Sequence, residues 1–225
     1  LFRKVQEKNW NHAYDQLSFQ GRMHPQIMDF PAKNFYGGRL EALPFLQSSK
    51  EEVNSDAHFL EQKRMVFWGS EVQEEELLTK TNRDEAQKVV HLIATYQKLW
   101  AKQGLDWTDS TLGVITPFRA QIAQIKKEVW ASDIDQAESI NVDTVERYQG
   151  SARDIIIMSL CVNRADQWSA ICSLNTEGVD RKLNVALTRA RKHFVLIGHA
   201  QHIADQELYA RLVRQMARYE EVYGA

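Results

Sequence analysis

Apolar residues recur along this chain at two spacings, one typical of amphipathic helices and one typical of buried strands. Helical spacing is clearest between Asn82 and Gln103, ahead of Gly104. Its apolar members are Ala86, Val89, Val90, Ile93 and Leu99. Asn82 followed by Glu85 has the form of an N-cap with its reciprocal acid. The pattern therefore predicts a long helix that starts at a capping box.

Shorter apolar runs predict buried strands that are separated by further helices. The strands are expected at residues 64–68, 111–116, 140–145, 154–162 and 193–198. Helices are expected after Pro117 and over residues 181–190 and 203–223, with a short one over 1–16. Strands that alternate with helices in this way call for a mostly parallel sheet with helices on both faces. The predicted fold class is therefore α/β.

Composition limits the classes of protein that remain. The 225 residues are 44% hydrophobic, which is enough to bury one full core. A formal net charge of -2 argues against a histone-like binder, yet it permits a local basic groove. Cys161 and Cys172 are too few for a disulfide framework, and no Cys/His cluster has metal-ligand spacing. With no long apolar run, we expect a cytoplasmic or nucleoid-associated protein that is not secreted and has no membrane span.

One segment departs from the slightly acidic average. Residues 181–193 carry five Lys or Arg and no acid. So many cations in a short segment point to an anionic ligand, with phosphate as the first choice. On an arbitrary helix such cations would only solvate the surface, so the interpretation depends on the surrounding sequence.

Three strings resemble motifs of superfamily 1 helicases, in the version of the 5′-to-3′ branch. Residues 183–191, LNVALTRAR, are similar to the sixth helicase motif. Thr144, then Gln149-Gly150, then Asp154 before three isoleucines resemble the fifth motif. Residues 17–40 resemble the fourth-motif region. The matching residues there are Gln20, Arg22, Met23, His24, Pro25, Phe35, Tyr36, Gly37 and Leu40.

This resemblance implies a RecA-like fold and a place in a larger motor. Residues 17–225 would be the second, C-terminal RecA-like domain, and residues 1–16 a lead-in helix from the preceding domain. ATP would bind between the two domains together with Mg²⁺. The Gly-Lys-Ser/Thr phosphate loop occurs nowhere in the sequence, so we expect it and the magnesium ligands on an absent first domain. The expected partners are that first domain and single-stranded nucleic acid, either DNA or RNA.

Individual roles follow from the same resemblance. Arg22 and Arg189 would contact the terminal phosphate of ATP, for which the planar donor fork of a guanidinium is suited. The nucleotide would also be contacted by Gln20, Gln149 and Gly150. Contacts with nucleic acid would come from Thr116, Pro117, Phe118, Thr144, Asn184 and Arg191. Hydroxyls and helix-start amides that bind phosphates read no base identity, which suits a translocating motor.

The spacing within the sixth motif separates two of its arginines. On a helix, Arg189 and Arg191 would lie about 200° apart and could not face the same way. We therefore assign Arg189 to phosphate and leave Arg191 for a structural or nucleic-acid contact. Taken alone, Thr116-Pro117 is also typical of a helix cap, and Gln149-Gly150 of an ordinary turn.

Two positions depart from the family pattern. Gly21 stands where the family usually has a tyrosine that stacks on the base, and Ala152 stands where it commonly has a glutamate. Because Arg22 and Arg189 are both present, we interpret the chain as part of an active ATP-dependent helicase, with the isolated chain inactive. The alternative is a catalytically inactive module that binds single strands or a protein partner. A stand-alone phosphotransferase is less favoured because the phosphate loop is missing.

Aromatic residues leave a further choice open. The tryptophans, such as Trp68, Trp100, Trp107 and Trp130, lie mostly near the ends of predicted elements. Aromatic rings in such places either pack against the core or stack on single-stranded bases. We favour packing for these residues.

Overall fold

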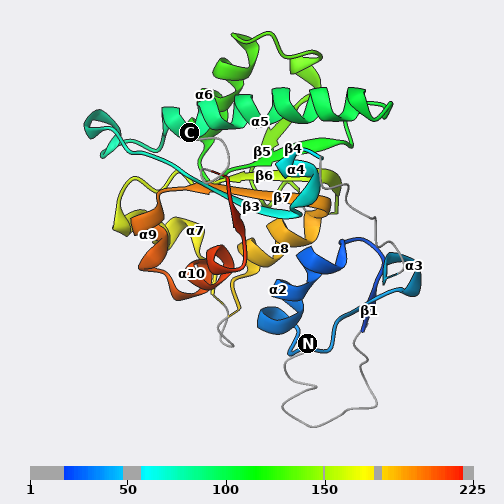
Figure 1. The fold of residues 1–225 in the computed structure, drawn as a ribbon. Helices are drawn as coiled ribbons and strands as arrows, with labels where there is room; N and C mark the ends of the chain where they lie inside the picture. The colour runs from blue at the N-terminus through cyan, green and yellow to red at the C-terminus, as the bar shows by residue number, and fades with distance from the viewer. Residues whose placement is uncertain (1–17, 48–56, 149, 175–178, 220–225) are drawn as a thin grey trace.

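A parallel β-sheet lies at the centre of the molecule (Figure 1). The computed structural model describes residues 18–47, 57–148, 150–174 and 179–219. Six strands pair in the order β5-β4-β6-β7-β3-β8, and every pair is parallel. They are β3 (Met65–Gly69), β4 (Leu112–Ile115), β5 (Asn141–Asp143), β6 (Arg153–Ser159), β7 (Ala190–Gly198) and β8 (Ala217–Arg218). The predicted parallel sheet is therefore confirmed.

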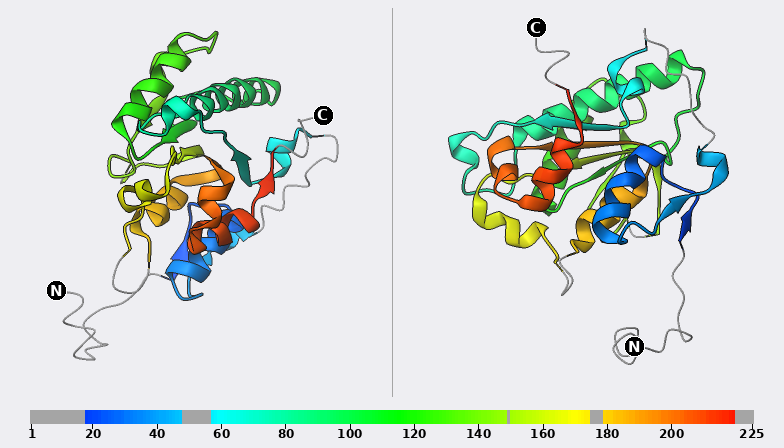
Figure 2. Two further views of the ribbon diagram at one scale, coloured as in Figure 1. Left: turned by 90° about the vertical axis from the view of Figure 1, so that its left-hand side faces the viewer. Right: turned by 60° about the horizontal axis from the view of Figure 1, so that its bottom comes forward.

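Helices cover both faces of this sheet, as Figure 2 shows from two sides. One face is covered by α4 (Phe59–Gln62), α5 (Arg83–Lys102) and α6 (Arg119–Trp130). The other is covered by α2 (Pro25–Phe35), α7 (Trp168–Ile171), α8 (Arg181–Arg189), α9 (Ala200–Ala204) and α10 (Glu207–Arg214). The result is the three-layer arrangement of a RecA-like domain.

The middle parts of the central strands are apolar because both of their faces are buried there. In β6, Ile155 and Ile157 pack beneath α5 and α6, whereas Ile156 and Met158 point to the opposite core. Each such side chain contributes roughly 1.5–3 kcal/mol of hydrophobic stabilisation when it is fully buried.

Short elements complete the fold outside the main sheet. A two-stranded parallel pair joins β1 (Phe19–Gln20) to β2 (Glu41–Ala42), and α3 (Pro44–Gln47) follows it. Three short 3₁₀ helices are η2 (Glu74–Glu76), η3 (Ala137–Ser139) and η4 (Ala165–Gln167). Within the described ranges, no helix combines the length and the apolar character needed to cross a membrane.

The C-terminal region differs from the prediction of one helix over residues 203–223. The chain instead forms α9 and α10, and then β8, which pairs with β3 through Val66 and Phe67. The apolar residues Ile203 and Leu208 are five positions apart, which does not continue one helical face. Residues 1–16 lie outside the described part of the chain, so the predicted lead-in helix stays a prediction. Helix α2 was not predicted.

The start of α5 confirms half of the predicted capping box. The Asn82 side chain accepts a hydrogen bond from the Glu85 N–H at 2.8 Å. The Asn82 N–H, however, donates to Oε1 of Gln121 at 2.8 Å rather than to Glu85. The prediction of a reciprocal acid is therefore wrong, because Gln121 on α6 has taken its place.

The Glu85 carboxylate instead ties α5 to the carboxyl ends of two strands. It is fully buried and accepts hydrogen bonds from Ser70 Oγ at 3.2 Å, Ser159 Oγ at 2.7 Å and the Cys161 N–H at 2.9 Å. Burial raises the pKa of Glu85 from its ordinary value of 4.5 to about 7, against the opposing effect of these donors.

This raised pKa predicts a pH-dependent stability. As pH rises from 4.5 towards 7, the unfolded chain releases the Glu85 proton while the folded chain retains it. The free energy of unfolding should therefore fall across this window, by about 3 kcal/mol at most, and stay level above it. Glu85→Gln should lack this fall. Urea unfolding at pH 5 and pH 7.5 would measure the fall, and Glu138→Gln, a change of an exposed glutamate, is the control. The same change in the free energy of unfolding between the two pH values for wild type and Glu85→Gln would contradict the assignment.

Candidate nucleotide and nucleic-acid sites

The residues predicted for two ligands lie at opposite edges of the sheet. Arg189 immediately precedes β7, and Gly150 lies shortly before β6, so both are near the amino ends of strands. Thr116 and Thr144 directly follow β4 and β5, at the carboxyl ends. In a parallel sheet all strands start at one edge and finish at the other. Arg189 and Gly150 are thus separated from Thr116 and Thr144 by the height of the sheet.

Arg22 and Arg189 meet at one pocket although they are far apart in sequence. They line a pocket of about 560 Å³ together with Gln20, Gly21 and Tyr36, among others. Arg22 Nη1 donates to the Thr188 carbonyl at 3.2 Å. This contact fastens the loop after β1 to the end of α8.

The Arg189 guanidinium is held by backbone and hydroxyl oxygens. It donates to the carbonyl of Val185 at 3.3 Å, to the carbonyl of Ser151 at 3.3 Å and to Thr188 Oγ1 at 3.3 Å. The first of these lies one helical turn back along α8. The second belongs to the segment before β6, so Arg189 connects two of the helicase-like motifs.

The two guanidinium groups form a positively charged pair. Partial burial, and then the charge of Arg22, lower the pKa of Arg189, although an arginine stays protonated in any case. Among the described residues, neither forms an ion pair with a carboxylate. Their mutual repulsion would be relieved by an anion with several acceptor oxygens, such as phosphate.

Gln20 shapes the loop that carries Arg22. Its Oε1 accepts hydrogen bonds from the N–H groups of Arg22 at 2.9 Å and Met23 at 2.7 Å, and its Nε2 donates to the Met23 carbonyl at 3.0 Å. The amide is therefore engaged inside the turn, while Gln20 also lines the arginine pocket. Its contact with a nucleotide stays a prediction.

The departure at Gly21 has a steric explanation. A Cβ at this position would lie 3.0 Å from Leu43 Cδ1 and 3.3 Å from the Phe45 ring. A larger residue would require both neighbours to move. Gly150 needs its glycine for another reason, since its φ of 91° lies in the left-handed region. Gln149 lies outside the described residues.

At the opposite edge, Pro117 and Thr144 line a groove of about 630 Å³. Three cations, Arg119, Lys126 and Arg147, line it as well. Both acids of the groove form ion pairs: Asp143 pairs with Arg147 inside the groove at 3.5 Å, and Glu146 pairs with Lys182 at 3.4 Å. Arg119 and Lys126 form no ion pair with a described carboxylate. Helix α6 begins here with no acid in its first turn and no side-chain cap, which leaves amide N–H groups available to phosphate.

Two neighbouring candidates do not reach this groove. Thr116 is fully buried, and its hydroxyl has no hydrogen-bond partner among the described residues. Phe118 is 6% exposed and packs in the core. The strand passes directly into α6, so alternate residues of this connection point inward and only Pro117 lies at the surface.

Asn184 and Arg191 also lie away from the groove. The Asn184 Nδ2 donates to the Tyr36 hydroxyl at 3.3 Å, on the side of the arginine pair. Arg191 forms an ion pair with Asp154 at 3.3 Å. The premise that Arg189 and Arg191 share a helix is wrong, because α8 ends at Arg189 and β7 has begun by Arg191.

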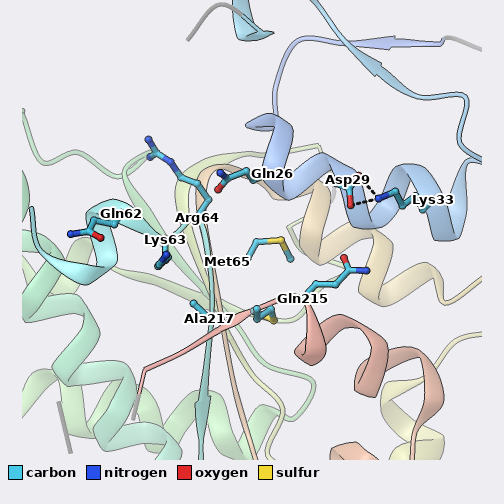
Figure 3. Close-up of a pocket in the computed structure, with 10 residues that line it drawn as sticks. Gln26, Asp29, Lys33, Gln62, Lys63, Arg64, Met65, Gln215 and Ala217 are labelled. Carbon is cyan, nitrogen blue, oxygen red and sulfur yellow. Dashed lines mark hydrogen bonds and ion pairs between the residues drawn. The ribbon is translucent and has the colours of Figure 1, made fainter. Parts of the chain in front are cut away.

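A further pocket contains none of the predicted residues. It measures about 740 Å³ and opens between α2, α4 and the turn from α10 to β8, as Figure 3 shows. Polar side chains such as Gln26, Gln62 and Arg64 line it, and Asp29 forms an ion pair with Lys33 at 2.7 Å. Among the described residues, no group of three or more His, Cys, Asp or Glu is placed to hold a metal ion.

Sequence analysis assigned no site role to several residues that line the two sites. Tyr36 joins the arginine pocket, and Arg119, Lys126 and Arg147 join the groove. Lys126 had a readable signal, because it follows Arg119 by seven positions and so shares its face of the helix. No sequence signal marks Arg147, because its position depends on how the chain turns after β5.

A parallel six-stranded sheet with helices on both faces is the architecture of a RecA-like domain. The family model described as an AAA domain matches residues 1–201, and the chain belongs to this family. Within it, the chain is a second RecA-like domain of the superfamily 1 helicase type.

Curated relatives agree with this assignment. "Helicase sen1" of Schizosaccharomyces pombe is 30% identical over 223 residues, which is 95% of this chain and 12% of that protein. "Regulator of nonsense transcripts 1 homolog" of Neurospora crassa is 31% identical over 207 residues, 88% of this chain and 18% of that protein. A solved structure, the C-terminal domain of a possible DNA helicase, matches 88% of this chain over 98% of its own length, with 16% sequence identity and a TM-score of 0.49. The assignment rests on the family model and not on this structure. This chain therefore spans less than a fifth of these two curated relatives.

The role of Gln20 predicts a loss of function without a loss of fold. In Gln20→Ala, the N–H groups of Arg22 and Met23 lose their acceptor, so the loop no longer holds the Arg22 guanidinium beside Arg189. A misplacement of about 1 Å can cost on the order of 100-fold in rate. If the full-length protein hydrolyses ATP, as the resemblance implies, its kcat should fall by roughly that factor in Gln20→Ala, with an unchanged melting temperature. Gln124→Ala on α6 is the control, and wild-type turnover by Gln20→Ala would refute the positioning role.

Proposed function

We propose that this chain is the C-terminal motor domain of an ATP-dependent DNA or RNA helicase. The observation that carries the proposal is the meeting of Arg22 and Arg189 in one pocket, with no carboxylate partner among the described residues. Two unpaired guanidinium groups suit the terminal phosphate of ATP, whose charge would be stabilised as the phosphoryl group transfers.

The rest of the ATP site belongs to a first RecA-like domain. That domain supplies the phosphate loop and the ligands for Mg²⁺, since the present sequence holds no Gly-Lys-Ser/Thr string. When bound, Mg²⁺ neutralises charge on the phosphates. The contribution of this chain is to close over the nucleotide and bring Arg22 and Arg189 to the terminal phosphate.

Nucleic acid binds at the opposite edge in this proposal. Thr144, Pro117 and the first turn of α6 face a basic groove, and groups of this kind bind backbone phosphates without reading the bases. Such binding would let the domain step past any sequence. It leaves the choice between DNA and RNA to contacts with the sugar.

One segment joins the two edges. It starts at Thr144 beside the groove and reaches Ser151, whose carbonyl accepts the hydrogen bond from Arg189 at 3.3 Å. Between them the buried Tyr148 donates to the Asn141 carbonyl at 2.6 Å, and its ring fits over Gly113, where a Cβ would lie only 2.5 Å from the hydroxyl. A movement of Arg189 during hydrolysis would thus be passed to the groove.

Loss of one guanidinium tests the proposal directly. We expect the full-length wild type to hydrolyse ATP in the presence of single strands, and Arg189→Ala to lose roughly 10³-fold or more in kcat, the range of an arginine finger. Arg189→Lys should recover little, because an ammonium lacks the planar fork. Arg211→Ala, a change of an exposed arginine on α10, is the control and should retain full turnover.

The same assay separates the rival function. If the purified wild type binds single strands but hydrolyses no ATP under any condition, the chain belongs to an inactive binding module, as the departures at Gly21 and Ala152 would allow. Full turnover by Arg189→Ala would remove the arginine from the mechanism.

A further inference from the structure

Helix α6 presents one continuous face that starts at the candidate nucleic-acid groove. Arg119, Lys126 and Trp130 are separated by seven and four positions, and such spacings place side chains on one side of a helix. Arg119 begins the helix and Trp130 ends it. At 1.5 Å per residue, the face extends over about 16 Å.

Two cavities adjoin along this face. The groove of Pro117 and Thr144 is lined by Lys126, and Lys126 also lines a shallow second pocket of about 550 Å³. The other residues of the second pocket are Ala123, Lys127, Trp130 and Ala131. Because Lys126 borders both, a ligand leaving the groove would reach Trp130 without crossing another element.

Trp130 is exposed in an unusual way for so large an apolar side chain. It is 63% accessible to solvent, whereas Trp100 and Trp168 are buried in the two cores. The small residues Ala123 and Ala131 beside it leave one side of the ring open. An exposed aromatic of this kind is available to a planar ligand.

The charges around the ring favour an anionic ligand. Arg119, Lys126 and Lys127 form no ion pair with any described carboxylate, and no acid lines the second pocket. The one nearby acid on α6, Glu128, is held by Arg83 at 3.5 Å and by Gln124 at 2.8 Å. Cations that alternate with an aromatic platform are the usual composition of a single-strand binding surface.

We propose that a single strand bound in the groove continues along α6, with phosphates at Arg119 and Lys126 and one base stacked on Trp130. The inference rests on the proposed function and extends it, because it adds a stacking site beyond the motif residues. It also reverses the expectation that Trp130 serves only for packing. Stacking is tolerant of sequence, since every base offers a flat face, so the surface keeps the indifference that a motor needs.

Strand length provides the sharpest test. We would measure binding of labelled oligothymidylate and oligouridylate to the full-length protein, with strands of about 4 and about 12 nucleotides. Trp130→Ala should weaken binding of the longer strand roughly 5- to 150-fold, the range for one stacked base, and leave the shorter strand unchanged. Lys126→Ala should lower the salt slope for the longer strand by about 0.7.

Conservative changes distinguish stacking from simple apolar contact. Trp130→Phe should retain most of the affinity for the longer strand, whereas Trp130→Leu should lose as much as Trp130→Ala. Lys98→Ala, on the exposed side of α5, is the matched control and should bind like the wild type.

The possible failures are separable. If the wild type binds neither strand, the proposed function itself fails. If the wild type binds both strands and Thr144→Ala weakens both, but Trp130→Ala weakens neither, only the α6 surface is refuted. Loss of a protein partner in Trp130→Ala with unchanged strand binding would also refute it, because the patch would then be a protein interface.

Discussion

Burial of the parallel sheet on both faces is the constraint on which the other features depend. Ile155 and Ile157 are covered by one layer of helices, and Ile156 and Met158 by the other. Neither face of the sheet is therefore open to a ligand at these positions. Chemistry is thereby confined to the two edges and to the outer surfaces of the helices. The arginine pocket occupies the edge where β6 and β7 start, and the basic groove the edge where β4 and β5 finish.

The two proposed ligand sites lie on opposite edges of the sheet, and the path of the chain connects them. After β5 the segment 144–151 returns to the start of β6, carrying Thr144 at one end and the Ser151 carbonyl at the other. Tyr148 fixes its middle against Gly113, whose missing side chain makes room for the ring. Among the described residues of this path, Tyr148 packs over Gly113 and the Ser151 carbonyl accepts a hydrogen bond from Arg189, and we propose that these contacts relate the position of Arg189 to the shape of the groove.

Much of this arrangement was predictable from the sequence, because apolar runs mark buried strands wherever both faces are covered. The motif strings assign Arg22 and Arg189 to one phosphate, and the structure places both in the lining of one pocket. Contacts that depend on tertiary structure were not predictable: local spacing pairs Glu85 with Asn82, yet the buried carboxylate accepts hydrogen bonds from Ser70 and Ser159, which lie 15 and 74 positions away. The burial of Thr116 was not predictable either, because it depends on how the chain passes from β4 into α6. Nor was the position at which α8 ends and β7 begins.

The most direct test is a structure of the full-length protein with ADP, Mg²⁺, aluminium fluoride as a phosphoryl mimic and a bound single strand. The account predicts that the guanidinium groups of Arg22 and Arg189 both lie within hydrogen-bond distance of the fluoride mimic, while the strand occupies the groove of Pro117 and Thr144. A mimic held by the first domain alone, with both arginines turned to solvent, would contradict the central claim.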